Sequence, residues 1–174
     1  MKLIGTIFLL TTAAHATTVT LRTTGQNLVS DTVWDAATDQ ATRMLAKIGV
    51  RLDWETQDSE APADRAAVHV RFLSDMPGHA EAMAFSNPIS SAPVIIVLYD
   101  RILFATDRVP GLRGALLAHV LVHEIGHVLM KSDAHSPVGV MKAQWSRSDY
   151  SRIASRLPLP FSPAEAELIR RLRP

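Results

Sequence analysis

The segment from residue 123 to 127 reads His123-Glu124-Ile125-Gly126-His127, in which two histidines stand four positions apart and a glutamate follows the first. On an α-helix, positions i and i+4 lie one turn apart on the same face, so the two imidazoles can bind one metal ion. Glu124 can then reach a water on that ion and act as a general base. The segment therefore predicts a catalytic Zn²⁺ site of the HExxH type.

The residues around this segment predict a buried helix. From Val120 to Leu129, every position other than the two histidines and the glutamate is uncharged and non-ionisable, and a helix that is apolar nearly all round must be buried. Buried polar side chains need partners, and one metal ion would satisfy both histidines. The alternative is that these histidines only bond to backbone groups. Gly126 costs about 1 kcal/mol relative to alanine inside a helix, which favours close packing of another element there.

A further histidine, His119, lies one turn before His123 on the same expected helix. Each helical turn rises about 5.4 Å, so three ligands stacked along one helix do not converge easily on one ion. We interpret His119 as a core histidine or as a support for a ligand.

The third metal ligand must come from outside this helix. The candidates are one histidine and several acids, namely Asp133, His135, Asp149, Glu165 and Glu167. Zinc prefers imidazole nitrogen, although carboxylates also serve. The polar, turn-forming segment 132–137 can reverse the chain after a helix that ends near Lys131. We therefore predict one Zn²⁺ bound by His123, His127 and His135, with Asp133 as the alternative third ligand.

Hydrophobic periodicity predicts an α+β domain around the long helix expected at 112–131. Strands are expected at residues 19–22, 50–54, 67–73, 81–86 and 93–99, where apolar and polar residues alternate or a short apolar run occurs. Helices are expected from about residue 31 to Lys47 and from Ser162 onward, the latter with a capping box between Ser162 and Glu165. The predicted architecture is a single domain, residues 17–174, with a twisted mixed sheet of about four to five strands and helices packed on it.

The first 16 residues read as an export signal. Lys2 precedes an apolar run from Leu3 to Ala14, and Ala14-His15-Ala16 matches a small-x-small cleavage site. The run is shorter than the roughly 20 residues that span a bilayer, which disfavours a membrane anchor. We expect a mature chain that begins at Thr17, is periplasmic or secreted, and has no stable membrane association.

The amino-acid composition excludes several kinds of partner and site. The sequence has 17 acidic and 18 basic residues, and loss of Lys2 with the signal would bring the formal charge to zero, so binding to nucleic acid is not expected. The absence of cysteine excludes thiolate zinc ligands and a cysteine nucleophile.

The stretch from residue 123 to 145 resembles the metzincin clan of zinc endopeptidases. In that clan an HExxH segment is followed by a glycine, by a third His or Asp, and by a methionine-containing turn, which Gly139-Val140-Met141 resembles. This chain departs from the clan by having Met130 at the glycine position and Asp133 at the third-ligand position, with His135 two residues later. The longer spacing is similar to that of uncharacterised bacterial exported proteins that are themselves metzincin-like.

The resemblance implies a zincin-like fold and a zinc-dependent metalloendopeptidase. The expected partner is then a peptide or protein substrate, and the expected state is a monomer. The resemblance places Met141 beneath the metal as an apolar floor, and gives Tyr150 either the role of stabilising the oxyanion or that of a plain surface residue. Substrate would bind as an extended strand along the edge strand expected at 81–86. Two alternatives remain open: an exported domain in which zinc is only structural, and another zinc amide hydrolase.

Overall fold

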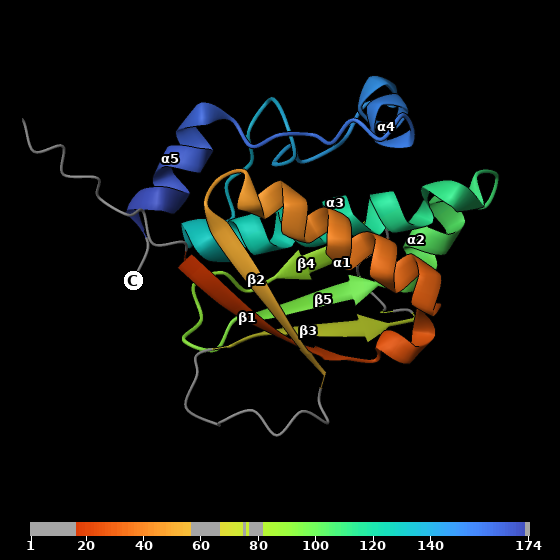
Figure 1. Ribbon diagram of the computed structural model, residues 1–174, viewed down its shortest axis with the longest axis horizontal. Coiled ribbons are helices and arrows are strands. Elements are labelled where there is room, and N and C mark those ends of the chain that lie inside the picture. The colour runs from red at the N-terminus through yellow and green to blue at the C-terminus, as the bar shows by residue number, and fades with distance from the viewer. Residues whose placement is uncertain (1–16, 57–66, 75, 77–81, 173–174) are drawn as a thin grey trace, which may run out of the picture.

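Five strands form one mixed sheet, and the two longest helices lie on the same side of it (Figure 1). The computed structural model describes residues 17–56, 67–74, 76 and 82–172. The export signal predicted at 1–16 and the first residue of the edge strand predicted at 81–86 lie outside the described residues.

The strands confirm the predicted α+β class and the predicted number of strands. They are β1 (Thr17–Thr24), β2 (Val50–Thr56), β3 (Ala67–Leu73), β4 (Ala84–Ser86) and β5 (Val94–Leu98). The sheet order is β2-β1-β3-β5-β4. The pairs β1–β2, β1–β3 and β3–β5 are parallel, whereas β4 runs antiparallel to β5 at one edge. The segment predicted as an edge strand is therefore an edge strand, although of its described residues, 82–86, only 84–86 belong to the strand.

The helices are α1 (Asp31–Ala46), α2 (Tyr99–Ala105), α3 (Arg113–Met130), α4 (Arg147–Ala154) and α5 (Pro163–Arg171), with short 3-10 turns at Gln26–Leu28 and Pro110–Leu112. Helices α1, α3 and α5 match the prediction, including the capping box of Ser162 and Glu165 that begins α5. Helices α2 and α4 were not predicted. They have 7 and 8 residues, too few for a helical period to stand out from a loop.

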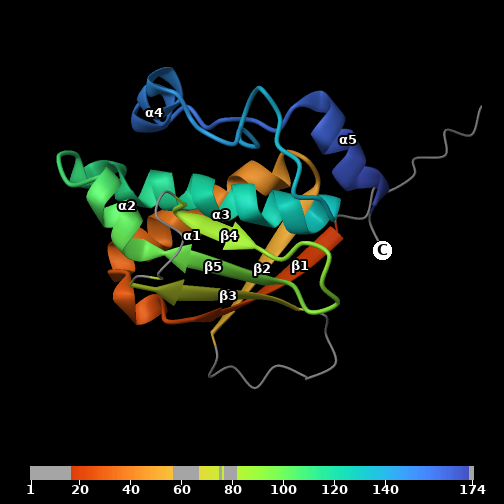
Figure 2. The same cartoon turned by 180° about the vertical axis from the view of Figure 1, so that it is seen from behind.

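Helix α3 lies in the middle of the molecule. In Figures 1 and 2 it runs between the sheet and a layer formed by α4, α5 and the segment that joins them. It contacts α1, α2, α4, α5, β4 and β5. This position explains why the helix is apolar nearly all round: it has neighbours on every side.

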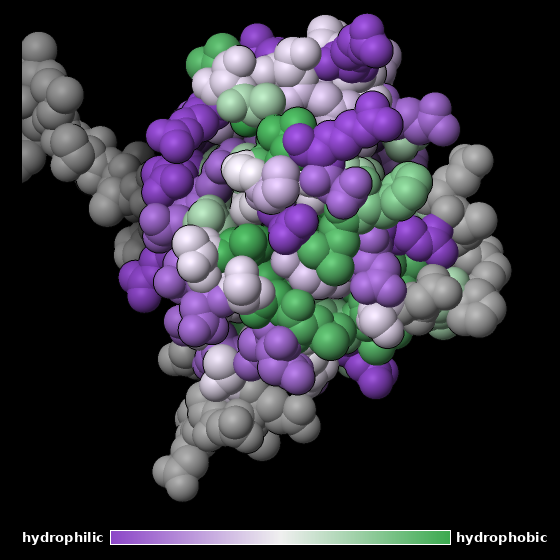
Figure 3. Space-filling view, turned by 90° about the vertical axis from the view of Figure 1, so that its right-hand side faces the viewer, coloured by the Kyte–Doolittle hydropathy of each residue, from purple (hydrophilic) through white to green (hydrophobic). Residues whose placement is uncertain are grey.

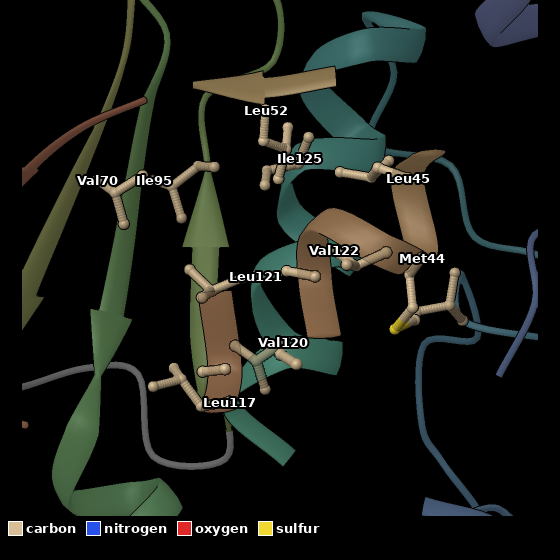
Figure 4. Close-up of a cluster of buried hydrophobic side chains, with 14 of the residues drawn as sticks. Met44, Leu45, Leu52, Val70, Ile95, Leu117, Val120, Leu121, Val122 and Ile125 are labelled. Carbon is tan, nitrogen blue, oxygen red and sulfur yellow. The ribbon is translucent and has the colours of Figure 1, made fainter. Parts of the chain in front are cut away.

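The hydrophobic core fills the space between α3, α1 and the sheet (Figure 4). Leu117, Leu121 and Ile125 of α3 are fully buried there, as are Leu45 of α1 and Ile95 of β5. Burying a side chain of this size contributes about 1.5–3 kcal/mol relative to leaving it exposed. The core thus holds α3 in one orientation, which decides where its polar side chains point.

The surface is of mixed polarity. On the face that lies at the right of Figure 1, hydrophobic residues are interspersed with hydrophilic ones (Figure 3). Exposed hydrophobic side chains include Phe104 near the end of α2 and Val109 just after it. Among the described residues, no helix has the length and apolar character needed to cross a bilayer.

Close packing of α1 on α3 leads to the first prediction. A Cβ placed on Gly114 of α3 would lie 2.8 Å from the Cβ of Ala36, whereas a Cβ on Gly111 would meet nothing within 4 Å. Gly114→Ala should lower the free energy of unfolding by about 1–3 kcal/mol, because overpacking outweighs the gain in helix propensity. Urea denaturation measures this, and Gly111→Ala, expected to be as stable as the wild type, is the matched control. A Gly114→Ala variant of undiminished stability would show that the two helices can move apart at little cost.

Candidate metal centre

Two histidines of α3 face each other across one helical turn. The ring centroids of His123 and His127 lie 4.6 Å apart with an interplanar angle of 80°, and their Nε2 atoms are 3.0 Å apart. Zn–N bonds of about 2.0–2.1 Å at tetrahedral angles place two ligand nitrogens about 3.3 Å apart. The spacing of the two Nε2 atoms is therefore close to that of two ligands of one ion.

Backbone carbonyls determine which nitrogen of each ring bears the proton. The Nδ1 atom of His123 lies 2.8 Å from the carbonyl oxygen of Val140, and that of His127 lies 2.8 Å from the carbonyl oxygen of Ser132. A carbonyl oxygen only accepts hydrogen bonds, so both Nδ1 atoms carry the proton and both Nε2 atoms have lone pairs. Two lone pairs facing each other at this distance repel unless a cation lies between them. The donor set therefore fits a metal ion.

The loop after α3 returns His135 to the same place. Lys131 ends the helix with a left-handed φ of 49°, and the amide of Ser132 donates to the carbonyl of His127. The His135 ring centroid then lies 5.2 Å from that of His123 and 4.8 Å from that of His127. One ligand atom from each of the three rings lies within 4.8 Å of the others. Among the described residues, these three histidines form the only such group.

The other candidate ligands have different surroundings. Asp133 lines the same hollow as the three histidines but is not part of their cluster. Asp149 forms an ion pair with Lys142 and caps α4, Glu165 caps α5, and Glu167 pairs with Arg170 and Arg171. The structure thus brings together the three predicted ligands and leaves the distal acids to other partners.

Burial keeps His123 and His127 neutral. It lowers the pKa of His123 to about 4, against the opposing effect of the bond to Val140. Burial also lowers the pKa of His127, again opposed by its bond to a backbone carbonyl. Near neutral pH both rings therefore lack a proton on Nε2, which is the form that binds a metal.

Glu124 lies beside this cluster and is only 5% exposed. Burial raises the pKa of its carboxyl to about 7, while a hydrogen bond from the side chain of Ser86 acts to lower it. Ser86 belongs to the edge strand β4 and was not recognised from the sequence as a functional residue. Its contact with Glu124 joins two segments 38 positions apart in the chain, and no local pattern indicates such a contact.

Two hollows meet at His123 and Glu124. One, of about 290 Å³, is lined by Trp145 and Tyr150; the other, of about 330 Å³, is lined by His127 and His135. Ala84 of β4 lines both. The candidate site is therefore an open cleft that runs along the edge strand. Tyr150 lines this cleft and is half-buried, rather than being a plain surface residue.

His119 has a purely structural environment. It is fully buried, its Nδ1 donates to the carbonyl of Ala115 at 2.6 Å, and its Nε2 accepts from the amide of Leu159 at 3.1 Å. Both nitrogens are thus engaged, and neither is available to a metal. Of the two roles predicted for His119, a core histidine or a support for a ligand, its burial and backbone bonds match the core histidine.

The segment 139–141 packs beneath the site. Met141 is fully buried, and a Cβ on Gly126 would lie 2.6 Å from its sulfur, which is the close packing predicted at that glycine. Gly139 has a φ of 73°, and a Cβ there would lie 2.2 Å from the carbonyl oxygen of Pro160. The amide of Val140 donates to that same oxygen. Only glycine fits at position 139, so the turn is held against the segment that precedes α5.

Together, a mixed five-stranded sheet and a long buried helix define the fold as that of the zincins, in the form found in archaemetzincins. No protein-family model and no curated protein matches the sequence. Among solved structures, the archaemetzincin of Methanopyrus kandleri is similar with a TM-score of 0.58 and 16% identity, covering 94% of this chain and 98% of that one. Metalloproteinase-II from Bacteroides fragilis is similar with a TM-score of 0.54 and 10% identity, covering 93% of this chain and 55% of that one. The likeness establishes the fold.

Proposed function

We propose that this chain is a zinc-dependent metalloendopeptidase in which His123, His127 and His135 bind one Zn²⁺ and Glu124 is the general base. The observation that carries the proposal is the pair of Nε2 atoms of His123 and His127 that lie 3.0 Å apart, with a third histidine and a buried carboxyl beside them. The fold shared with an archaemetzincin and a metalloproteinase supports the same function.

A Zn²⁺ ion held by these three histidines would supply a Lewis acid for a carbonyl and would lower the pKa of a water to about 7. Glu124 accepts the proton of the attacking water and passes it to the leaving amine. The Ser86 hydroxyl orients the Glu124 carboxyl. The carbonyls of Val140 and Ser132 hold the imidazoles in the tautomer that leaves Nε2 unprotonated.

Substrate would lie along β4 as an added strand. This strand is the last in the sheet order and pairs with β5 on one side, and Ala84 lines both hollows of the cleft. Main-chain hydrogen bonds to such an edge bind an extended peptide with little regard to its side chains. The scissile bond would thus lie beside His123 and Glu124. We expect the chain to act as a monomer.

Replacing the general base separates catalysis from metal binding. Glu124→Gln keeps the shape of the side chain but cannot accept a proton, so hydrolysis of a casein or peptide substrate should fall by about 10²- to 10⁴-fold. Zinc content, measured by atomic emission, should stay at one ion per chain. Glu167→Gln on the exposed face of α5 is the matched control and should retain activity. A wild-type protein that binds zinc and cleaves no peptide would instead favour the alternatives of a structural zinc site or another amide hydrolase.

The zinc content of two variants identifies the third ligand. His135→Ala should lose most of the bound zinc after dialysis against a weak chelator, whereas Asp133→Ala should keep it, because zinc prefers imidazole to a carboxylate at this site. His69→Ala, which removes an exposed histidine of β3, is the control for loss of an imidazole and should keep its zinc. The reverse result, with zinc lost in Asp133→Ala and kept in His135→Ala, would assign the ligand to Asp133.

We also propose that the chain is exported and cleaved after Ala16. Strand β1 begins at Thr17, so removal of residues 1–16 would leave every described strand and helix intact. N-terminal sequencing of the protein recovered from the periplasm or medium should begin at Thr17. Full-length protein retained in the cytoplasm would contradict this proposal.

A further inference from the structure

Trp145 lies between the turn that contains Met141 and the start of α4, and it is half-buried. Its indole Nε1 donates to the carbonyl oxygen of Val140 at 3.2 Å. The same oxygen accepts from Nδ1 of His123 at 2.8 Å. A carbonyl oxygen has two lone pairs, so it can accept both bonds at once. One backbone carbonyl therefore links the indole to an imidazole of the candidate metal site.

Ring contacts fix the position of the indole. Trp145 meets His123 edge to face, with centroids 6.1 Å apart at 85°, and meets His119 in the same manner at 5.9 Å and 82°. A third edge contact joins it to Tyr150 at 6.3 Å. Since His119 is itself held at both nitrogens, the indole rests against an immobile neighbour on one side and against the candidate ligand on the other.

The backbone of Val140 has a further hydrogen bond, at its amide. The Val140 amide donates to the carbonyl of Pro160 at 2.9 Å, and the adjacent Met141 is fully buried. Val140 is thus held at its amide by Pro160 and at its carbonyl by Trp145, and that carbonyl is the one that supports His123. Partners that orient a metal-bound histidine typically change metal affinity about 10- to 100-fold when removed.

We propose that Trp145 is a positioning residue of the metal site: it holds the Val140 carbonyl and the His123 ring so that Nε2 of His123 points at the ion. The proposal rests on the proposed function through the metal site alone and does not require peptide hydrolysis. Trp145 also lines the hollow of about 290 Å³ beside His123 and Glu124, so the same side chain forms part of the wall of the cleft.

The test is the affinity of the metal-free protein for zinc, measured by competition with a chromophoric chelator. Trp145→Phe retains a ring at this position and removes the indole donor. The dissociation constant for zinc should rise about tenfold, at the lower end of the range for such partners because the direct bond of His123 to Val140 remains. The visible absorption spectrum of the Co²⁺-loaded protein should change as well, since it reports ligand geometry.

Trp54→Phe is the matched control. The Trp54 indole donates to the hydroxyl of Thr42 at 3.2 Å and meets Trp34 edge to face at 5.4 Å, so this variant loses an equally long bond from an indole on β2. Its affinity for zinc and its Co²⁺ spectrum should match those of the wild type. If both variants bound zinc equally weakly, the effect would be a general loss of stability, and the proposal would be overturned.

An unchanged dissociation constant and Co²⁺ spectrum in Trp145→Phe would also overturn it. Trp145→Tyr is the second variant if Trp145→Phe does not fold, and failure of both to fold would assign the indole to stability instead. A wild-type protein that binds no zinc would defeat the proposed function itself, whereas a wild type that binds zinc with Trp145→Phe equal to it would defeat only the positioning role.

Discussion

The candidate metal site depends on two hydrogen bonds from imidazole Nδ1 atoms to backbone carbonyls. One runs from His123 to Val140 and the other from His127 to Ser132. They place the proton of each ring away from the cluster and leave two Nε2 lone pairs facing each other. Each carbonyl belongs to the segment that follows α3, so that segment must return across the helix. The left-handed residue at Lys131 and the glycine at 139 make the return possible.

Burial determines what the polar residues of α3 can do. His119 is fully buried and has both ring nitrogens bonded to the backbone. Neither nitrogen is therefore free to bind a metal. His123 and His127 each have one nitrogen bonded and one directed into the cleft. Glu124 has a hydroxyl from Ser86 as a partner, and its raised pKa shows how poorly its charge is solvated; a dication at the histidines would favour the charged form. Helix α3 thus carries one structural histidine and the three groups that the proposed function uses.

Much of the fold follows from local pattern. The alternation in β3 and the apolar run of β5 predicted their strands, and the capping box of Ser162 and Glu165 predicted the start of α5. The two missed helices are short, and α2 follows β5 with no intervening turn, so no glycine or proline separates them. Helix α4 begins with a capping box between Ser146 and Asp149, a signal that is visible in the sequence but weak without an apolar run after it.

Local pattern in the chain predicts that His123 and His127 share one face of a buried helix with Glu124 beside them, because helical periodicity and the apolar flanks are local properties. The sequence also indicated His135 through the chemistry of zinc ligands. Three contacts become visible only in the folded chain: His135 reaches the other two histidines, Ser86 bonds to Glu124, and Trp145 shares the Val140 carbonyl with His123. These contacts join separate segments, and the packing of α3 between the sheet and the C-terminal layer sets them. The spacing of residues within one segment does not predict how distant segments pack together.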